Sequence, residues 1–266
     1  MSTLSYAVAD SATMLRRQLR HMQRYGSMTV LLIGMPIVFL LLFVYVFGGT
    51  LGNGLGGSSG GREAYVQYVT PGILLIAVAS VAQGTAISVA MDMTEGIIAR
   101  FRTMAIFRPS VLTGHVLGAM IETMLTLAVV VGVALLIGFR SSATPVEWVA
   151  AAGMLALIAL ALTWLTVALG MSTKSVEAAS NVPMPLVFLP FLGSGFVPTE
   201  SMPVGLRWFA EYQPFTPVME TVRGLLLGSA IGGSAAIAVA WCVGIALVGY
   251  LWARKLYNRD PVQVVR

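Results

Sequence analysis

Long stretches without a charged residue limit the folds open to this chain. Five intervals lack Asp, Glu, Lys and Arg altogether, and a sixth is interrupted only by Glu122. A helix that crosses the roughly 30 Å hydrocarbon core of a bilayer needs about 20 apolar residues, and every interval is at least that long. The sequence therefore predicts six transmembrane helices, near residues 28–48, 69–91, 113–139, 148–169, 180–197 and 232–253.

The overall composition agrees with a chain embedded in lipid. Of the 266 residues, 57% are hydrophobic and 10% are charged, whereas soluble domains contain about 25% charged residues. So little polar surface cannot keep a folded globule in water. We expect an all-α integral membrane protein in which residues 1–266 form a single transmembrane domain.

Residue counts exclude several kinds of site. The chain has two histidines and one cysteine, too few for a disulfide framework or a clustered zinc site. Its two lysines, Lys174 and Lys255, do not stand in the Gly-Lys-Ser/Thr sequence of a phosphate-binding P-loop. If ATP drives the function, the nucleotide is bound by another polypeptide.

Cationic residues are concentrated on one predicted side of the membrane. With the N-terminus inside, twelve of the 16 Lys and Arg residues lie on the N-terminal side, and the other side holds only Arg62, Arg140, Arg207 and Arg223. Because Lys and Arg are retained in cytoplasmic loops, both termini are predicted to be cytoplasmic. A nucleic-acid surface fits less well, since these cations are scattered over short loops rather than gathered on one face.

The segment before the first span has the pattern of an amphipathic helix over residues 11–25. Its apolar positions recur at steps of three and four, and its cations occupy the remaining arc: Ala12, Leu15, Leu19 and Met22 against Arg16, Arg17, Arg20 and Arg24. This pattern is typical of a helix that lies in the membrane interface, with Ser11 as a plausible N-cap. The alternative is a solvated basic flank without a fixed helix.

The loop after the second predicted span contains a second short helix, predicted over residues 94–104. Thr94 can cap it, and Glu95 would lie at the positive end of the helix dipole. An apolar side that could meet a soluble partner is formed by Ile97, Ile98, Phe101 and Met104. The alternative is a reverse turn rich in cations.

Two further segments are predicted on the outer side. Residues 48–61 are rich in glycine and serine, a composition that favours a flexible loop. Residues 198–228 are divided by prolines into amphipathic pieces of about ten residues, too short to span a bilayer. We expect these pieces to form two short helices that dip into the outer leaflet, with aromatic residues at headgroup depth.

Few polar or aromatic residues within the spans are candidates for a transport pathway. Glu122 is costly in lipid unless it is paired or protonated, so it is either a pathway residue or a packing carboxyl satisfied by Gln83 or Thr163. Gly114 and Gly118 would permit close approach of another helix. Aromatic residues of the first and fifth spans could line a pathway or belong to the core or the lipid-facing surface: Phe39, Phe43, Phe188 and Phe191.

In this order and spacing the segments resemble the membrane-spanning permease subunits of type-2 ABC exporters, particularly the daunorubicin-resistance branch, with nodulation-factor and polysaccharide exporters as relatives. The resemblance rests on the basic helix before the first span and on four motifs: YVTPGIL at 68–74, EGIIARFRTMAIFRPS at 95–110, LPFLGSGFVPTESMP at 189–203 and PFTPVMETVRGLLLG at 214–228. The similarity extends over nearly the whole chain.

The resemblance implies a permease in the bacterial inner membrane that exports a hydrophobic or amphipathic substrate, such as a drug, a lipid or a lipid-linked glycan. It implies pairing with another permease, either a second copy, as a homodimer, or a different chain, and docking onto a dimer of separate ATPase subunits that bind ATP and Mg. The chain itself would then be no enzyme and would carry no cofactor.

The resemblance also assigns roles to residues. The helix over 94–104 would be the coupling helix that contacts the ATPase, through Glu95, Gly96, Ile97, Ile98, Arg100, Phe101 and Arg102. Lys174 and Glu177 would form a smaller second contact. The outer helices would be a re-entrant hairpin that closes the pathway on the outside, with Pro198, Glu220 and Arg223 at this gate.

Two other classes of function compete with this interpretation. A self-contained secondary transporter or channel often has inverted repeats and charges at mid-membrane, whereas the two halves of this chain differ and only Glu122 is charged within a span. A membrane enzyme would need convergent catalytic groups, which the sequence does not supply.

Overall fold

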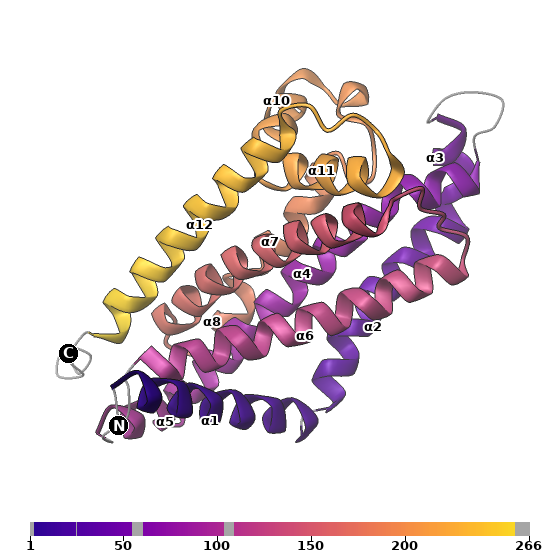
Figure 1. Ribbon diagram of the computed structural model, residues 1–266. Helices are drawn as coiled ribbons and strands as arrows, with labels where there is room; N and C mark the ends of the chain where they lie inside the picture. Colours follow the sequence, from indigo (N-terminus) through magenta and orange to yellow (C-terminus); the bar gives the residue numbers. More distant parts are fainter. Residues whose placement is uncertain (1–2, 25, 55–60, 104–108, 259–266) are drawn as a thin grey trace.

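The computed structural model describes residues 3–24, 26–54, 61–103 and 109–258, and all of its regular elements in these ranges are helical (Figure 1). Five helical segments are long and apolar enough to cross a membrane. They coincide with five of the six predicted spans: residues Thr29–Gly54, α4 (Arg62–Thr94), Ser110–Leu136 within α6 (Pro109–Leu136), α7 (Pro145–Ser172) and α12 (Ser234–Tyr257). The prediction of an all-helical chain with several apolar helices of membrane-spanning length is thereby confirmed.

The first long segment continues beyond its predicted end. It consists of α2 (Gly26–Leu42), one turn of π-helix (Phe43–Phe47) and α3 (Gly48–Gly54). The glycine-rich segment predicted as a loop over 48–61 is therefore helical in its first half, and residues 55–60 lie outside the described residues.

Helix α4 lies at the centre of the bundle, in contact with α2, α6, α7, α8, α9 and α11. In its most apolar stretch 78% of the residues are buried, against 17% in the first long segment and in α12. A helix that is hydrophobic all round is expected inside a bundle. The exposed apolar surfaces of α2 and α12 need another cover, either lipid or protein.

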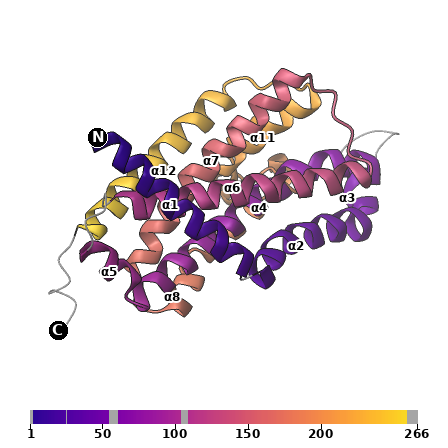
Figure 2. The ribbon, with the colours of Figure 1, turned by 60° about the horizontal axis from the view of Figure 1, so that its bottom comes forward.

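The bundle has two ends that differ in their elements. One end, which we call the basal end, carries α1 (Thr3–Arg24), α5 (Ile97–Thr103) and the last turns of α12 (Figures 1 and 2). The opposite, distal end carries α3, α10 (Val204–Tyr212) and α11 (Phe215–Leu227). The prediction of two short helices after residue 198 is confirmed by α10 and α11.

The predicted fifth span, residues 180–197, is not one continuous helix. It is divided into α8 (Val176–Asn181), α9 (Met184–Phe188) and a 3-10 turn (Leu189–Leu192). Prolines at 183, 185 and 190 interrupt it, because proline has no amide hydrogen and its ring clashes with the preceding helical turn.

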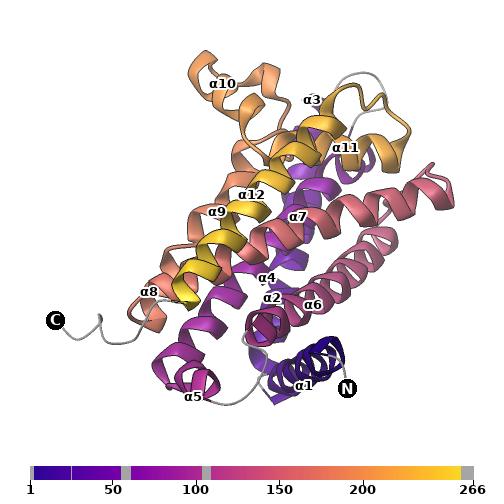
Figure 3. The same ribbon diagram turned by 60° about the vertical axis from the view of Figure 1, so that its left-hand side comes forward.

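The broken segment nevertheless follows α4 over a long distance (Figure 3). Near one end Gln83 Nε2 donates a hydrogen bond to the Ser180 carbonyl oxygen at 2.6 Å, and near the other Tyr65 Oη donates to the Phe196 carbonyl oxygen at 3.4 Å. Gln83 and Tyr65 are 18 residues apart on one helix, which corresponds to about 27 Å at 1.5 Å per residue.

Residues 11–24 of the amphipathic segment predicted over 11–25 belong to α1, which begins earlier, so Ser11 lies inside the helix and is not its N-cap. α1 packs along α6, and the small residues Gly114 and Gly118 form the contact. A Cβ atom at Gly114 would stand 2.6 Å from Met14 Cβ, and one at Gly118 would stand 2.4 Å from Gln18 Cγ. The predicted close approach at these glycines is confirmed, with α1 as the partner.

Gly114→Ala tests this contact. The new methyl group has to displace the Met14 Cβ, which cannot rotate away, so we expect a loss of about 1–3 kcal/mol in stability. Gly132→Ala on the same helix is the matched control, because a Cβ there meets nothing within 4 Å and alanine favours the helix by up to about 1 kcal/mol. Thermal unfolding of the purified chain in detergent should therefore shift in opposite directions; equal shifts would contradict the α1–α6 packing.

Candidate functional site

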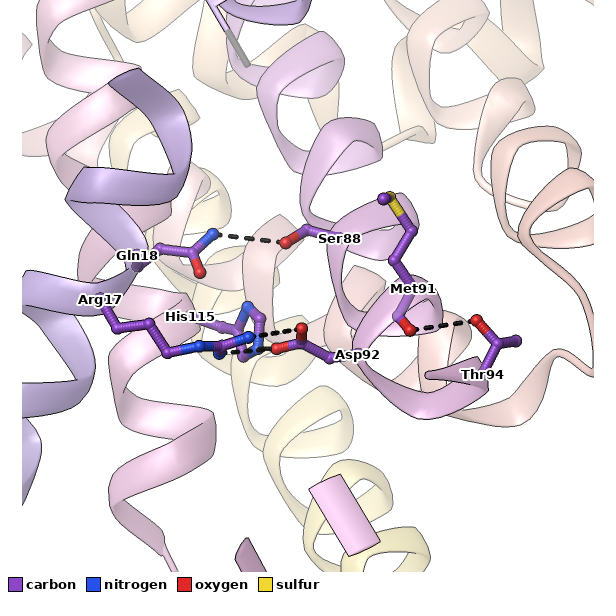
Figure 4. A network of polar contacts seen from close by, with 7 residues as sticks. All are labelled: Arg17, Gln18, Ser88, Met91, Asp92, Thr94 and His115. Atoms are coloured by element: carbon purple, nitrogen blue, oxygen red, sulfur yellow. Dashed lines mark hydrogen bonds and ion pairs between the residues drawn. The ribbon is translucent and has the colours of Figure 1, made fainter. Parts of the chain in front are cut away.

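A buried carboxylate joins the helices of the basal end. Asp92 lies in the last turn of α4 and is 6% exposed. Arg17 of α1 donates two hydrogen bonds to it, from Nη1 to Oδ2 at 2.8 Å and from Nη2 to Oδ1 at 2.6 Å (Figure 4). Two parallel bonds between a guanidinium and a carboxylate fix the orientation of both groups. α1 is thereby fastened to the end of α4.

His115 attaches a third helix to the same carboxylate. Its Nε2 atom lies 3.1 Å from Asp92 Oδ2, and the residue is 2% exposed on α6. Neither Asp92 nor His115 is among the site residues predicted from the sequence. The position of Asp92 at the end of a long apolar helix does indicate a partner, because an acidic residue there is expected to be paired.

Arg17 also reaches the short helix α5. Its guanidinium carbon lies 5.5 Å from the centre of the Phe101 ring, within the range of a cation–π interaction. On the next residue of α1, Gln18 Nε2 donates a 3.4 Å hydrogen bond to Ser88 Oγ of α4. One arginine side chain thus contacts both α4 and α5.

Helix α5 follows α4 after a tight turn. The Thr94 hydroxyl donates to the Met91 carbonyl oxygen at 3.0 Å and Glu95 is the C-cap of α4, so the prediction that Thr94 caps the next helix is wrong. Gly96 has φ +70°, a left-handed conformation that favours glycine. This turn redirects the chain so that α5 stands at the basal end.

The residues predicted to contact an ATPase divide into two groups. Glu95 and Arg100 are exposed and Ile97 is half-buried, so these side chains are accessible. Ile98 is 1% exposed and packs with α4, α6, α7 and α12 residues, and Phe101 is half-buried beside Arg17. Ile98 is therefore not presented at the surface, and its predicted contact with the ATPase is wrong. Met104 and the Arg102 side chain lie outside the described residues.

The second predicted contact lies on α8. Lys174 and Glu177 are exposed around the start of this helix, and Ser175 caps it by accepting a 3.2 Å hydrogen bond from the Ala178 amide. Hydrogen bonds from its own backbone amide and from the Ser175 hydroxyl lower the pKa of the Glu177 carboxyl, so it is charged at neutral pH. α8 is held to α4 by the bond from Gln83 to Ser180.

The four arginines of the amphipathic helix do not share one environment. Arg16, Arg20 and Arg24 are exposed, as the pattern predicts. Arg17 is turned toward the bundle and pairs with Asp92. Periodicity alone could not separate Arg17 from its neighbours, because its partner is 75 residues away in the sequence.

The four aromatic residues singled out from the spans do come together. Phe191 is the centre, with ring centroids 5.6 Å from Phe39, 6.1 Å from Phe43 and 6.4 Å from Phe188. Phe196, which sequence reasoning missed, stacks on Phe191 at 4.6 Å. The cluster joins the first long helical segment to the broken fifth segment. These aromatic residues therefore act together, whether they line a pathway or pack the two segments against each other.

Glu122 is not satisfied by either predicted neighbour. Gln83 bonds to Ser180, and the Thr163 hydroxyl has no hydrogen-bond partner among the described residues. The hydrogen-bonding neighbour of Glu122 is Thr29 at the start of α2. Spacing along α6 could not reveal this partner.

The distal end is held by a partly buried cation, Arg223. Arg223 of α11 donates hydrogen bonds from Nη2 to the carbonyl oxygens of Ser194, at 2.7 Å, and Tyr68, at 3.2 Å. Its guanidinium carbon lies 4.0 Å from the centre of the Tyr68 ring. Glu220 is exposed and accepts a 2.7 Å bond from Ser234 Oγ. Arg223 therefore fixes α11 to α4.

The other distal helix, α10, is much less buried. Its apolar and aromatic side chains are largely exposed, and Pro198 is half-buried just before a 3-10 turn (Thr199–Ser201) that precedes it. Among the described residues no group of three or more His, Cys, Asp or Glu side chains could hold a metal ion.

Comparison with known proteins gives a consistent result. The model of the ABC-2 type transporter family matches residues 11–227, from α1 through α11. A daunorubicin resistance ABC transporter permease, DrrB1 of Streptomyces coeruleorubidus, is 29% identical over 91% of this chain and 83% of its own length. A probable doxorubicin resistance ABC transporter permease, DrrC of Mycobacterium tuberculosis, is 28% identical over 86% of this chain and 82% of its own length.

Asp92→Asn tests the basal network. The amide keeps the shape of the side chain but removes its charge, so the bonds from Arg17 lose their ionic component. We expect a loss of about 1–3 kcal/mol, less than for a fully buried pair because Arg17 is partly exposed. Glu95→Gln, the same chemical change three residues away on an exposed side chain, serves as control. Thermal unfolding in detergent compares them, and equal stability of the two variants would refute a structural role for the network.

Proposed function

The chain belongs to the ABC-2 type transporter family and is a membrane-spanning permease subunit of an ABC exporter, and we propose that its helix α5 couples it to ATP hydrolysis on separate subunits. The nucleotide and its Mg would be bound there. The observation that carries this proposal is the contact of one side chain, Arg17, with both Asp92 and Phe101.

Accessible surface at the basal end supports a docking role for α5. The helix lies at the basal end of the bundle after a tight turn, with Glu95, Ile97 and Arg100 accessible to a soluble protein. Lys174 and Glu177 of the α8 region add opposite charges as a second contact. Polar groups around a small apolar area are the usual composition of a non-obligate interface.

The basal network offers a route from α5 into the spans. A displacement of α5 moves Phe101 and Ile98. Because Phe101 contacts Arg17, and Arg17 and His115 bind Asp92, the displacement is transmitted to α1, α4 and α6. Packed elements tied by ionic hydrogen bonds move as rigid bodies. In the proposed cycle, closure of the ATPases shifts these helices together, and the pathway opens on the other side.

We propose that the basal end is cytoplasmic. The exposed cations Arg16, Arg20, Arg24, Lys174 and Lys255 lie there, which agrees with the positive-inside rule. α1 would then lie in the cytoplasmic interface with its arginines among lipid phosphates. The membrane would be the bacterial inner membrane, because both relatives named above come from bacteria.

The broken segment would provide a sixth crossing. It follows α4 for about 27 Å between Ser180 and Phe196, close to the roughly 30 Å of the hydrocarbon core. Non-helical backbone at that depth is tolerated where protein covers it, and α4 lies alongside. With six crossings both termini lie on the same side.

We further propose that α10 and α11 form an outer re-entrant gate. α10 presents Trp208, at 66% exposure, and Tyr212, at 64%, and such aromatic residues prefer the depth of the lipid headgroups. Arg223 would hold the closed position of α11, with Pro198 and Glu220 at its flanks. Opening would break the bonds from Arg223 to Ser194 and Tyr68.

A second copy of the chain would complete the pathway. The apolar surfaces of α2 and α12 are mostly exposed in the single chain, and the cluster of Phe39, Phe43, Phe188 and Phe191 includes a residue of α2. A pathway lined by aromatic residues suits a hydrophobic or amphipathic substrate, such as a drug, a lipid or a lipid-linked glycan. The names of the relatives favour a drug.

Charge reversal of the α5 surface tests the coupling. In the variant Glu95→Arg with Arg100→Glu, the contacts with the ATPase become repulsive, and we expect permease-stimulated ATP hydrolysis to fall at least tenfold in the reconstituted complex. The matched control is Glu211→Arg with Arg207→Glu on α10, which reverses an exposed pair at the distal end and should retain full stimulation. Full coupling in the α5 variant, or transport by the permease alone under an ion gradient, would contradict the proposal.

Accessibility of single cysteines tests the topology. Ser142→Cys lies before α7 at the distal end and Ser172→Cys lies at its basal end, and both positions are exposed. The native Cys242 is buried and should give little background. A membrane-impermeant maleimide added to intact cells should label the first variant and spare the second until the membrane is opened. Labelling of the second variant alone in intact cells would invert the proposed orientation.

A further inference from the structure

A cavity of about 140 Å³ is lined by residues of α1, α2, α4 and α6. Its wall is mostly apolar, from side chains such as Met22, Leu32 and Met91. Five polar side chains also line it, two of them from α4 and one from each of the other helices: Gln18, Thr29, Thr85, Ser88 and Glu122. A largely apolar cavity with a few convergent polar groups is the usual form of a small-molecule site.

Glu122 contributes to this cavity an acidic group that forms no ion pair with another described residue. Its carboxyl is half-buried and has the hydroxyl of Thr29 as hydrogen-bonding neighbour. The ion pairs formed between described residues join Asp92 to Arg17 and His115, and Glu211 to Arg207, so none of them involves Glu122. A carboxylate away from water is stabilised by a cation that hydrogen-bonds to it.

We propose that this cavity binds the protonated amine of a lipophilic cation, with the ammonium group on Glu122. Gln18, Ser88 and Thr29 supply oxygen atoms that can accept hydrogen bonds from the remaining N–H groups of an ammonium group. This inference deepens the proposed function, on which it rests, by naming a ligand class and a binding position for the exporter.

The size of the cavity fixes which part of the ligand it holds. An apolar protein cavity of about 150 Å³ binds benzene, so this one accommodates the amine and roughly one ring. The rest of a larger molecule would lie on the exposed apolar surface beside it, formed by Leu125 of α6, three residues after Glu122, and Val30 of α2. The ligand is therefore amphipathic, with a cationic end inserted and an apolar body in lipid.

The depth of the cavity indicates where the ligand comes from. Thr29 is three residues after the start of α2 and Ser88 is six residues before the end of α4, which places them about 5 and 9 Å from the basal ends of these helices. With the basal end in the cytoplasm, the cavity lies in the inner leaflet. Amphipathic amines that have partitioned into that leaflet reach it laterally.

Binding by the permease without its ATPase tests the site. The full-length chain is placed in nanodiscs of phosphatidylcholine and phosphatidylglycerol and titrated with dansylcadaverine, a fluorescent primary amine. Glu122→Gln should weaken this binding at least tenfold while leaving the weaker binding of the neutral N-acetyl derivative unchanged. Glu200→Gln, the same change on an exposed distal carboxyl, should leave both affinities at the wild-type values.

Three further measurements keep the test decisive. Glu122→Asp, which keeps the charge, should retain most of the affinity, and size-exclusion elution identical to the wild type shows that each variant is folded. Replacing phosphatidylcholine by phosphatidylethanolamine should leave dansylcadaverine binding intact; displacement would mean that lipid ammonium groups occupy the site. Equal affinity of the wild type for the amine and for its neutral derivative would overturn the proposal. The ATPase-coupling experiment does not depend on the outcome of these binding measurements.

Discussion

One carboxylate, Asp92, holds the basal end of the bundle together. It is almost fully buried and is bound by Arg17 of α1 and His115 of α6. Removing a buried carboxylate's partner is costly, because the charge is left without compensation. Arg17 in turn contacts Phe101 of α5. The positions of α1, α4, α5 and α6 therefore depend on one another, and a displacement of α5 cannot remain local.

Small residues and a largely buried central helix complete this arrangement. Gly114 and Gly118 let α1 lie against α6, which brings Arg17 within reach of Asp92 and encloses the cavity that contains Glu122. α4 is buried along most of its length, while the surfaces of α2 and α12 are open. The bundle thus has a rigid centre and unsatisfied apolar flanks, a division that suits a subunit whose proposed pathway is completed by a partner.

Much of the fold could be predicted from the sequence, because lipid imposes a simple rule on length and polarity. Five spans, the amphipathic helix and the two distal helices lie close to where charge-free intervals, periodicity and prolines indicate. The broken fifth segment was not predicted, since hydropathy does not register the effect of Pro183, Pro185 and Pro190 on the backbone. The site was predicted less well, because Arg17 and Asp92 are 75 residues apart, and spacing along one helix says nothing about contacts between helices.

A double-mutant cycle on Arg17 and Asp92 is the most direct test of the central claim. The variants Arg17→Gln, Asp92→Asn and their combination are reconstituted with the ATPase, and permease-stimulated ATP hydrolysis is measured for each. If the pair transmits the motion, each single substitution strongly reduces the stimulation of ATP hydrolysis. The double variant then retains as much stimulation as the more impaired single variant, because the second substitution removes no further interaction. Independent, additive losses, or full stimulation in both single variants, would contradict the account.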